Sequence, residues 1–192
     1  MGLSVLALMN RELFIKLQYN PYLAHHNKQW YRFLTHALIH AGWIHLGVNM
    51  YVLYLFGNLT ETFYDIHFGG KGMLFYLLLY VGGTLFSSLP ALKKNKDNYS
   101  YNAVGASGAV SAVLFASILF IPMQPIRFFF IPIEMPAFVF GFLYLVFEIY
   151  QSKKAMDNIA HDAHYWGAIF GVLYTILIKP SIIAEFLWKI FG

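Results

Sequence analysis

An apolar segment near the C-terminus reads, from residue 163 to residue 171, AHYWGAIFG. If the segment is helical, His164, Gly167 and Gly171 are spaced i, i+3 and i+7 and share one face. Two glycines four residues apart let a second helix approach closely, and small residues of this kind line helix contacts in membranes. We therefore predict a helix that packs on a partner through its glycines and points an imidazole at that partner.

A partner with matching small residues is found near the middle of the chain. Residues 105–108 read GASG, and Ala112 follows one turn later. A contact between the two segments would place Ser107 beside His164. A serine in a membrane helix often only bonds its own carbonyl four residues back, and a histidine can simply bond a neighbour. Their coincidence among small residues favours a pair in which the histidine activates the serine as a nucleophile.

The composition indicates a membrane protein. Of the 192 residues, 59% are hydrophobic and 11% are charged, whereas soluble domains carry about 25% charged residues. The chain contains no cysteine, which excludes disulfides, thiol chemistry and cysteine-ligated metal sites. The net charge of +4 comes from Lys and Arg residues near the ends of apolar stretches. Because these residues form no single stripe, membrane lipid headgroups are the expected partner and nucleic acid is not.

Long apolar stretches predict the membrane topology. A helix that crosses the hydrocarbon core needs about 20 residues, and five stretches reach or approach this length. They lie at roughly 41–60, 72–92, 102–122, 133–150 and 163–179. Residues 1–9 are apolar but too short to cross, so we interpret them as a short or truncated first helix. The prediction is a single polytopic, all-α membrane domain over residues 1–192, with 10–40 lying at the membrane surface.

Polar side chains inside these spans are functional candidates, because the bilayer makes them expensive. His45 and Asn49 open the second span, Ser107 the fourth and His164 the last. Spans two, four and six run in the same direction, which brings the four side chains to one side of the membrane. A few residues into a helix correspond to roughly 5–10 Å below the surface. The site is expected to lie within the bilayer yet within reach of water.

These stretches resemble the motifs of the rhomboid intramembrane serine proteases. Residues 105–108 resemble the family's GxSG motif, and residues 163–171 resemble its AHxxGxxxG motif. The stretch from Arg32 to Glu61 is similar to the family's first loop and second helix. Three motifs in the expected order on the expected spans make the resemblance specific, and it covers nearly the whole chain after residue 20.

The resemblance implies a rhomboid-like six-helix bundle and an intramembrane serine endopeptidase that uses neither metal nor cofactor. Ser107 would attack the scissile carbonyl and His164 would take its proton, as a dyad without a third acidic member. His45, Asn49 and the backbone N–H of Ser107 would form the oxyanion hole. Negative charge that develops in a dry site needs such preorganised donors.

The resemblance also implies supporting roles. Structural or water-handling residues would be Arg32, His36, His40, Glu61, Gly105, Gly167 and Gly171. The span at 133–150 would be a lateral gate for the substrates, which would be transmembrane segments of other proteins. The expected location is the bacterial inner membrane with the active site on the non-cytoplasmic side. Nine of the 13 basic residues then lie on the active-site side, which runs against the positive-inside rule.

A departure from the family pattern lies at Ser111. An aromatic residue commonly follows the nucleophile by four positions and packs on the catalytic imidazole, whereas this chain has a serine there. Tyr165 or Phe170 would then have to orient His164.

Other interpretations of the same residues stay open. A non-catalytic relative that binds transmembrane helices would share the fold, but retention of both Ser107 and His164 favours an enzyme. A transporter would show an inverted repeat or a pair of broken helices, and the sequence shows neither.

Histidine pairs at helical spacing suggest a metal site. The pairs are His36 with His40 and His161 with His164. Neither pair has a convincing third carboxylate ligand, so no metal is predicted. Asp162 is interpreted as the N-cap of the last helix.

Overall fold

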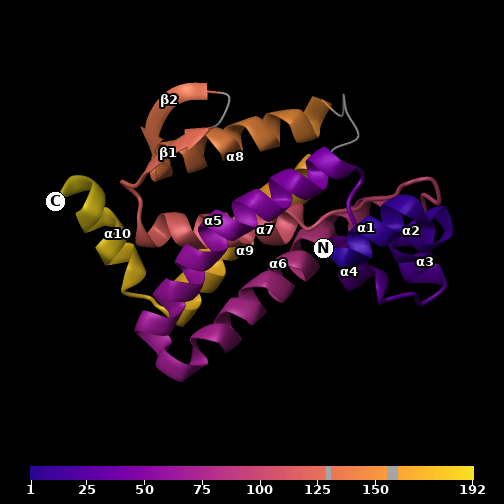
Figure 1. Cartoon of the computed structure of the whole chain (residues 1–192), viewed down its shortest axis with the longest axis horizontal. Helices are drawn as coiled ribbons and strands as arrows, with labels where there is room; N and C mark the ends of the chain where they lie inside the picture. The colour runs from indigo at the N-terminus through magenta and orange to yellow at the C-terminus, as the bar shows by residue number, and fades with distance from the viewer. Residues whose placement is uncertain (129–130, 155–159) are drawn as a thin grey trace.

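The computed structural model describes residues 1–128, 131–154 and 160–192, and it is mostly helical (Figure 1). The helices are α1 (Gly2–Met9), α2 (Arg11–Leu17), α3 (Pro21–His26), α4 (Arg32–Thr35), α5 (Trp43–Phe68), α6 (Gly72–Asn95), α7 (Ser107–Phe120), α8 (Ala137–Lys154), α9 (His161–Ile178) and α10 (Ile182–Phe191). Short 3-10 turns occupy η1 (His36–Leu38) and η2 (Gly69–Lys71). The strands β1 (Pro125–Phe128) and β2 (Ile131–Pro136) form an antiparallel pair.

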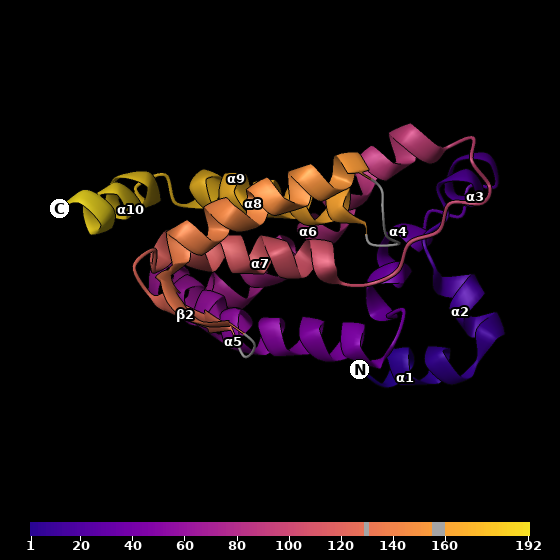
Figure 2. The same cartoon turned by 90° about the horizontal axis from the view of Figure 1, so that it is seen from above.

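Helix α7 lies in the middle of the bundle. Every residue from Gly108 to Phe120 is buried, as expected of a helix that is apolar on all sides. Helices α5, α6 and α9 pack directly against it, and Figure 2 shows α7 between α5 on one side and α8 with α9 on the other. The central helix therefore sets the positions of its neighbours, and its first residue is Ser107.

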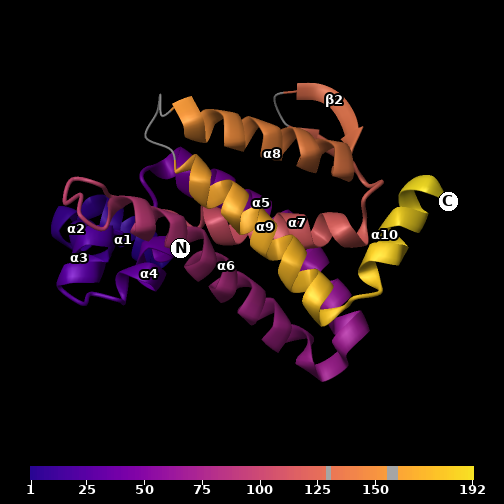
Figure 3. The same ribbon diagram turned by 180° about the vertical axis from the view of Figure 1, so that it is seen from behind.

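Helices α7 and α9 touch through their backbones. A Cβ atom added to Gly167 would lie 2.0 Å from the carbonyl oxygen of Gly108, and one added to Gly171 would lie 2.1 Å from that of Ala112. Figure 3 shows α9 crossing α7, with α6 alongside. The small-residue faces that are visible in the sequence are thus the surfaces by which the two helices pack.

The N-terminal helices α1 to α4 gather at one end of the bundle (Figures 1 and 2). Tyr19 and Ala103 exchange two backbone hydrogen bonds, each 2.9 Å long. This pairing ties the segment that leads into α7 to the N-terminal region. As a result, the approach to Ser107 is held in place by residues far away in the sequence.

Large apolar side chains cover the outer faces of α5, α6 and α8. Ile44 is 84% exposed on α5 and Phe142 is 67% exposed on α8, whereas soluble monomers rarely expose contiguous apolar surface of this kind. By length and hydropathy, the stretch Trp43–Asn95, which joins α5 to α6, qualifies to cross a membrane. The bent pair of α9 and α10 would count as a second such segment. The outer faces agree with this indication of a lipid environment.

The all-α prediction is wrong at one place. Strands β1 and β2 pair with Ile126 opposite Met135 and Arg127 opposite Glu134. The hairpin takes up the start of the predicted span 133–150, so α8 begins only at Ala137. The preceding residue, Pro136, has no N–H and is tolerated best at the start of an α-helix, which fits a helix that begins at Ala137.

The predicted span 102–122 also begins too early, because α7 starts at Ser107. The reason is Gly105, whose φ of +116° is incompatible with a right-handed helix. Residues before this glycine run as an irregular segment instead of adding a turn to the helix.

Candidate active site

A turn that requires glycine presents Ser107. Gly105 has a positive φ, which residues with side chains rarely adopt, and a Cβ there would lie 2.5 Å from Cε1 of His45. The N–H of Gly105 donates to the carbonyl oxygen of His36 at 2.9 Å. The turn is therefore fixed from two sides, and Ser107 follows it as the first residue of α7.

The N-terminus of α7 offers backbone amides beside the serine. The N–H of Val110 donates to the carbonyl oxygen of Ala106 at 2.9 Å, so the amides of Ser107, Gly108 and Ala109 precede the first bond of the helix. No side chain caps this end, and a helix N-terminus carries partial positive charge. Both features favour a negatively charged oxygen next to Ser107.

Ser107 and His164 form a direct hydrogen bond. The distance between Oγ of Ser107 and Nε2 of His164 is 2.8 Å, and the imidazole side chain is 15% exposed. The backbone contact of α7 with α9 joins Gly108, directly after Ser107, to Gly167, three residues after His164, so it determines how close the two side chains come. This is the arrangement by which a histidine base activates a serine nucleophile.

Two donor side chains lie one turn apart on α5, and the first of them, His45, lies close to the turn at Gly105. Nδ1 of His45 accepts a hydrogen bond from the N–H of Ala41 at 3.3 Å, which leaves the ring proton on Nε2. That Nε2 lies 2.8 Å from the point where a Cβ of Gly105 would be. Asn49 is 4% exposed and donates one amide hydrogen to the carbonyl of His45 at 2.9 Å. Its second amide hydrogen is available to another acceptor.

Arg32 and His36 hold the N-terminal region against the bundle. Nη1 of Arg32 donates to the carbonyl oxygens of Ile15 at 2.9 Å and Gln18 at 2.6 Å. Nε2 of His36 bonds Oγ of Ser88 on α6 at 3.1 Å. Burial lowers the pKa of His36 to about 4, so the ring is neutral at pH 7.

His40 supports the ring of His45. It is 2% exposed, its Nδ1 bonds Oγ of Ser4 at 3.1 Å, and its ring meets that of His45 edge to face at 5.1 Å. Burial, together with the nearby charge of His45, lowers the pKa of His40 to about 4. Glu61 lies 16 residues after His45 on α5, roughly 24 Å along the helix axis, and is not brought to the site.

The structure adds Glu148, a carboxylate that neither the sequence patterns nor the resemblance singled out. It lies on α8 and is 4% exposed. Its Oε2 is 2.6 Å from Nδ1 of His161 and 3.1 Å from Nδ1 of His164. A signal was present in the sequence, because Glu148 is the single acidic residue of α8 and ionisable residues in membrane spans are functional candidates.

Ser111 has a different partner from the one its family position suggests. Its Oγ bonds the hydroxyl of Tyr144 on α8 at 2.9 Å, so an aromatic side chain reaches this position from another helix. Phe170 packs on Phe86 with ring centroids 5.4 Å apart, and the ring of His161 lies beside that of His164, at 5.9 Å.

Two further expectations concern the start of α9. Tyr165 packs on Trp166, with ring centroids 5.6 Å apart. Asp162 is not the N-cap, which is Ala160. The helix begins one residue before Asp162, so its carboxylate lies in the first turn and accepts from the N–H of Ala163 at 3.0 Å, where a negative charge still complements the helix dipole.

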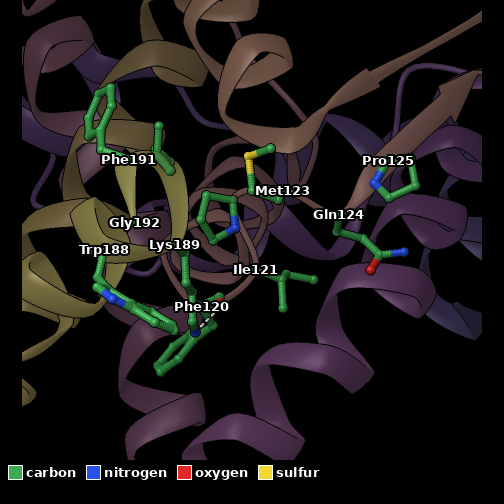
Figure 4. A pocket seen from close by; sticks show the side chains of 11 residues that line it. Phe120, Ile121, Met123, Gln124, Pro125, Trp188, Lys189, Phe191 and Gly192 are labelled. Atoms are coloured by element: carbon green, nitrogen blue, oxygen red, sulfur yellow. Dashed lines mark hydrogen bonds between the residues drawn. The ribbon is translucent and has the colours of Figure 1, made fainter.

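A hollow of about 690 Å³ lies at the opposite end of α7 from Ser107 (Figure 4). Residues 120–125 and 188–192 line it. Nζ of Lys189 donates to the carbonyl oxygen of Phe120 at 2.7 Å and so satisfies the C-terminal end of α7. The hollow contains no nucleophile paired with a base, so it is not the candidate active site.

Comparisons with known proteins cover most of the chain. The family model described as Rhomboid domain matches residues 27–181. Rhomboid-like protein 11, chloroplastic, of Arabidopsis thaliana is 32% identical over 169 residues, which cover 82% of this chain and 56% of that protein. Rhomboid protease GluP of Bacillus subtilis (strain 168) is 28% identical over 143 residues, which cover 74% of this chain and 25% of that protein.

A third relative has a mitochondrial name. RHOMBOID-like protein 12, mitochondrial, of Arabidopsis thaliana is 29% identical over 165 residues, which cover 77% of this chain and 46% of that protein. The chain thus spans between a quarter and just over half of the length of these relatives.

Proposed function

The chain belongs to the rhomboid family of membrane proteins, and from this premise we propose that it is an intramembrane serine endopeptidase. Its substrates are transmembrane segments of other membrane proteins. The observation that carries the proposal is the 2.8 Å hydrogen bond between Ser107 and His164 at the start of the buried helix α7. The name of the Bacillus relative, a rhomboid protease, supports the same reaction class.

The proposed reaction proceeds in two steps. Ser107 attacks the scissile carbonyl carbon while Nε2 of His164 takes the hydroxyl proton, and the imidazolium then protonates the leaving amine. A water molecule, deprotonated by the same nitrogen, attacks the acyl-enzyme and releases the new carboxyl terminus. In both steps the carbonyl oxygen becomes negative. The proposed donors to this oxygen are the backbone amide of Ser107 and the side chains of His45 and Asn49.

The lengths of the helices support a site inside the bilayer. At 1.5 Å per residue, the 14 residues of α7 extend about 21 Å, whereas the hydrocarbon core is about 30 Å thick. The 26 residues of α5 extend about 39 Å by the same rule. We propose that α5 to α9 are the crossing helices and that α7 begins below the surface. Helix α10, bent by 111° from α9, then lies along the membrane.

We place the active site on the non-cytoplasmic side, as the family topology implies, and assign the chain to a bacterial inner membrane. The relatives carry chloroplast, mitochondrial and bacterial names, so they support a membrane location in general. Membrane-impermeant labelling of cysteines introduced singly at exposed positions 99 and 188 in whole cells tests the orientation. Position 99 alone should react from outside.

Serine-reactive labelling tests the proposed enzyme class. Purified protein in detergent is treated with a biotinylated fluorophosphonate, and the modified peptide is identified by mass spectrometry. We expect modification at Ser107 and cleavage of a transmembrane reporter that the label inhibits. Labelling elsewhere with Ser107 unmodified, or labelled protein that cleaves at the wild-type rate, would exclude the proposal.

Asn49→Ala is expected to lower turnover by roughly 10–1000-fold, the scale seen when one oxyanion donor is removed. The fluorophosphonate should still modify Ser107, because the serine and its base stay in place. The measurement is the initial rate of reporter cleavage beside the labelling yield. Unchanged turnover would assign Asn49 a purely structural role within α5, through its bond to His45.

The packing of α8 supports lateral entry of substrate. Helix α8 packs on α9 and α7, whereas among the described residues it makes almost no contact with α5. Phe142 points outward, and Phe138 packs only partly buried against the core around Leu114. We propose that substrate enters between α5 and α8. A substrate helix hides its carbonyls in its own hydrogen bonds, so cleavage should favour segments with glycine or proline near the active-site face.

The double variant Phe138→Ala/Phe142→Ala is expected to cleave membrane-embedded substrates severalfold faster than wild type, because smaller side chains loosen α8. Cleavage of short soluble peptides should change little. The single variant Phe142→Ala changes only an exposed side chain and keeps the core intact. Leu177→Ala is the matched control, because it removes a similarly exposed side chain from the far end of α9. Equal effects on both substrate types would reject lateral entry.

A further inference from the structure

A buried cluster lies behind His164, on the side away from Ser107. Oε2 of Glu148 is 2.6 Å from Nδ1 of His161 and 3.1 Å from Nδ1 of His164. Each of the three residues offers one atom of a type that binds metals, and these three atoms lie within 4.8 Å of one another. The two histidines are three residues apart and share a face of α9, and Glu148 meets them from α8.

Within the described residues, the cluster pairs the carboxylate of Glu148 with histidines and with no lysine or arginine. Among the described residues, the ion-pair partners of Glu148 are the two histidines. Its side chain is 6% exposed, and a buried carboxylate without a compensating charge is costly. If both imidazoles are neutral, a cation held between the three side chains would supply that compensation.

A second observation comes from Nδ1 of His164. This atom is buried and makes no hydrogen bond within the part of the chain that the structure describes. The carboxylate oxygen at 3.1 Å is near enough but is not in line with the N–H. Buried polar atoms in folded proteins nearly always have a partner. The lone pair of this nitrogen is therefore well placed to bind an ion located between Glu148 and His161.

We propose that Glu148, His161 and His164 bind a divalent transition ion such as Zn²⁺ and that the bound ion switches the peptidase off. Two histidines and a glutamate are an established zinc ligand set that leaves one position for water. With Zn–N and Zn–O distances near 2.0–2.1 Å, tetrahedral ligand atoms are about 3.4 Å apart. To reach this separation, the 2.6 Å and 3.1 Å distances from Glu148 to the two histidines need to lengthen by less than one ångström.

Inhibition by the bound ion follows from the chemistry of the His164 ring. This inhibition, unlike the metal site itself, rests on the proposed function. To act as a base, His164 needs its proton on Nδ1 and a lone pair on Nε2, facing Ser107. An ion on Nδ1 uses the lone pair of that atom and moves the ring proton to Nε2. Nε2 then has no lone pair to accept the serine proton. In the metal-free protein, Glu148 favours the opposite tautomer, because a carboxylate 3.1 Å from Nδ1 attracts a proton on that atom and repels a lone pair.

Cobalt absorption tests the site without reference to proteolysis. Chelator-stripped protein in detergent is titrated with Co²⁺, and the ligand-field absorption of four-coordinate cobalt is followed, then reversed by Zn²⁺. We expect one ion per chain in wild type and affinity at least roughly 10-fold weaker in His161→Ala and Glu148→Gln. His26→Ala is the matched control, because His26 is exposed and pairs with Asp97. Its affinity should equal that of wild type.

The binding result is decisive in either direction. Absence of four-coordinate cobalt in wild type, or undiminished affinity in both variants, would overturn the site. Glu148→Gln keeps the side-chain volume, and circular dichroism shows whether each variant retains its helices, so weak binding is not confused with unfolding.

Cleavage assays test the switch separately. We expect Zn²⁺ to stop reporter cleavage by wild type and by His26→Ala, with recovery after chelation, and Mg²⁺ to have no effect. His161→Ala, compared with its own metal-free rate, should resist Zn²⁺. Zinc that binds without slowing cleavage would overturn the switch. Metal-free protein that never cleaves would contradict the proposed function, while the cobalt absorption would still report on the site.

Discussion

Ser107→Ala is expected to reduce cleavage of a transmembrane reporter by at least about 10⁴-fold, in practice below detection. The methyl group cannot attack a carbonyl, so the proposed nucleophile is lost. His164→Ala should have an effect of the same size, because the serine hydroxyl then loses the acceptor that lies 2.8 Å away. Both proteins should remain folded, since neither side chain fills the core of α7 or α9.

The double variant Ser107→Ala/His164→Ala should be no slower than either single variant. Residues that act as one unit give non-additive losses, because removal of one already disables the other. Rates are measured with a fluorogenic reporter in detergent and again in liposomes. Losses that multiply in the double variant would show that the two residues act independently, and the pair would have to be abandoned as a catalytic unit.

Ser117→Ala is the matched control for this series. Ser117 lies on the same helix, is fully buried, and its Oγ donates to the carbonyl of Leu114 at 2.7 Å. It has the same chemistry as Ser107 but bonds its own helix. We expect near-wild-type cleavage, and a loss comparable to that of Ser107→Ala would show that the assay reports folding rather than catalysis.

The contact between the central helix and the last crossing helix could be predicted because it depends on local spacing. Gly167 and Gly171 share a face at helical periodicity, and the side chain of His164 lies on that face whatever the rest of the fold does. The family assignment, which is drawn from the same residues, is confirmed by the match over residues 27–181. Catalysis by Ser107 and His164 stays a prediction.

The position of Glu148 could not be predicted in this way. Whether it meets His164 depends on the rotation and tilt of α8, and nothing in the spacing of its own residues fixes these. The hairpin before α8 shifts the start of that helix to Ala137, and Tyr144 bonds Ser111. Together these contacts turn Glu148 inward. Contacts between distant segments of this kind follow from packing rather than from periodicity.

The glycine contact explains why the geometry of the site depends on the packing of two helix backbones. Ser107 sits on α7 and His164 on α9, and no other covalent or hydrogen-bonded link fixes their separation within the described residues of the two helices. The helices are in backbone contact at Gly167 and Gly171, where no space is left for a Cβ atom. Any added atom at this contact must separate the two catalytic candidates.

Gly167→Ala is therefore expected both to destabilise the protein and to slow it. The new Cβ would lie 2.0 Å from the carbonyl oxygen of Gly108, and a backbone atom cannot rotate away. Overpacking of this kind costs about 1–3 kcal/mol. A displacement of about 1 Å between reacting groups lowers the rate roughly 100-fold. The measurements are the midpoint of thermal unfolding in detergent and the rate of reporter cleavage at a temperature where the variant is folded.

Gly47→Ala separates this clash from the general effect of replacing glycine in a helix. Gly47 lies on α5, where an added Cβ meets nothing within 4 Å, and alanine should stabilise the helix by about 1 kcal/mol relative to glycine. The unfolding midpoint of Gly47→Ala should thus rise or stay level while that of Gly167→Ala falls. If Gly167→Ala unfolds at the wild-type temperature, α7 and α9 are not in backbone contact, and the distance between Ser107 and His164 must be set by something else.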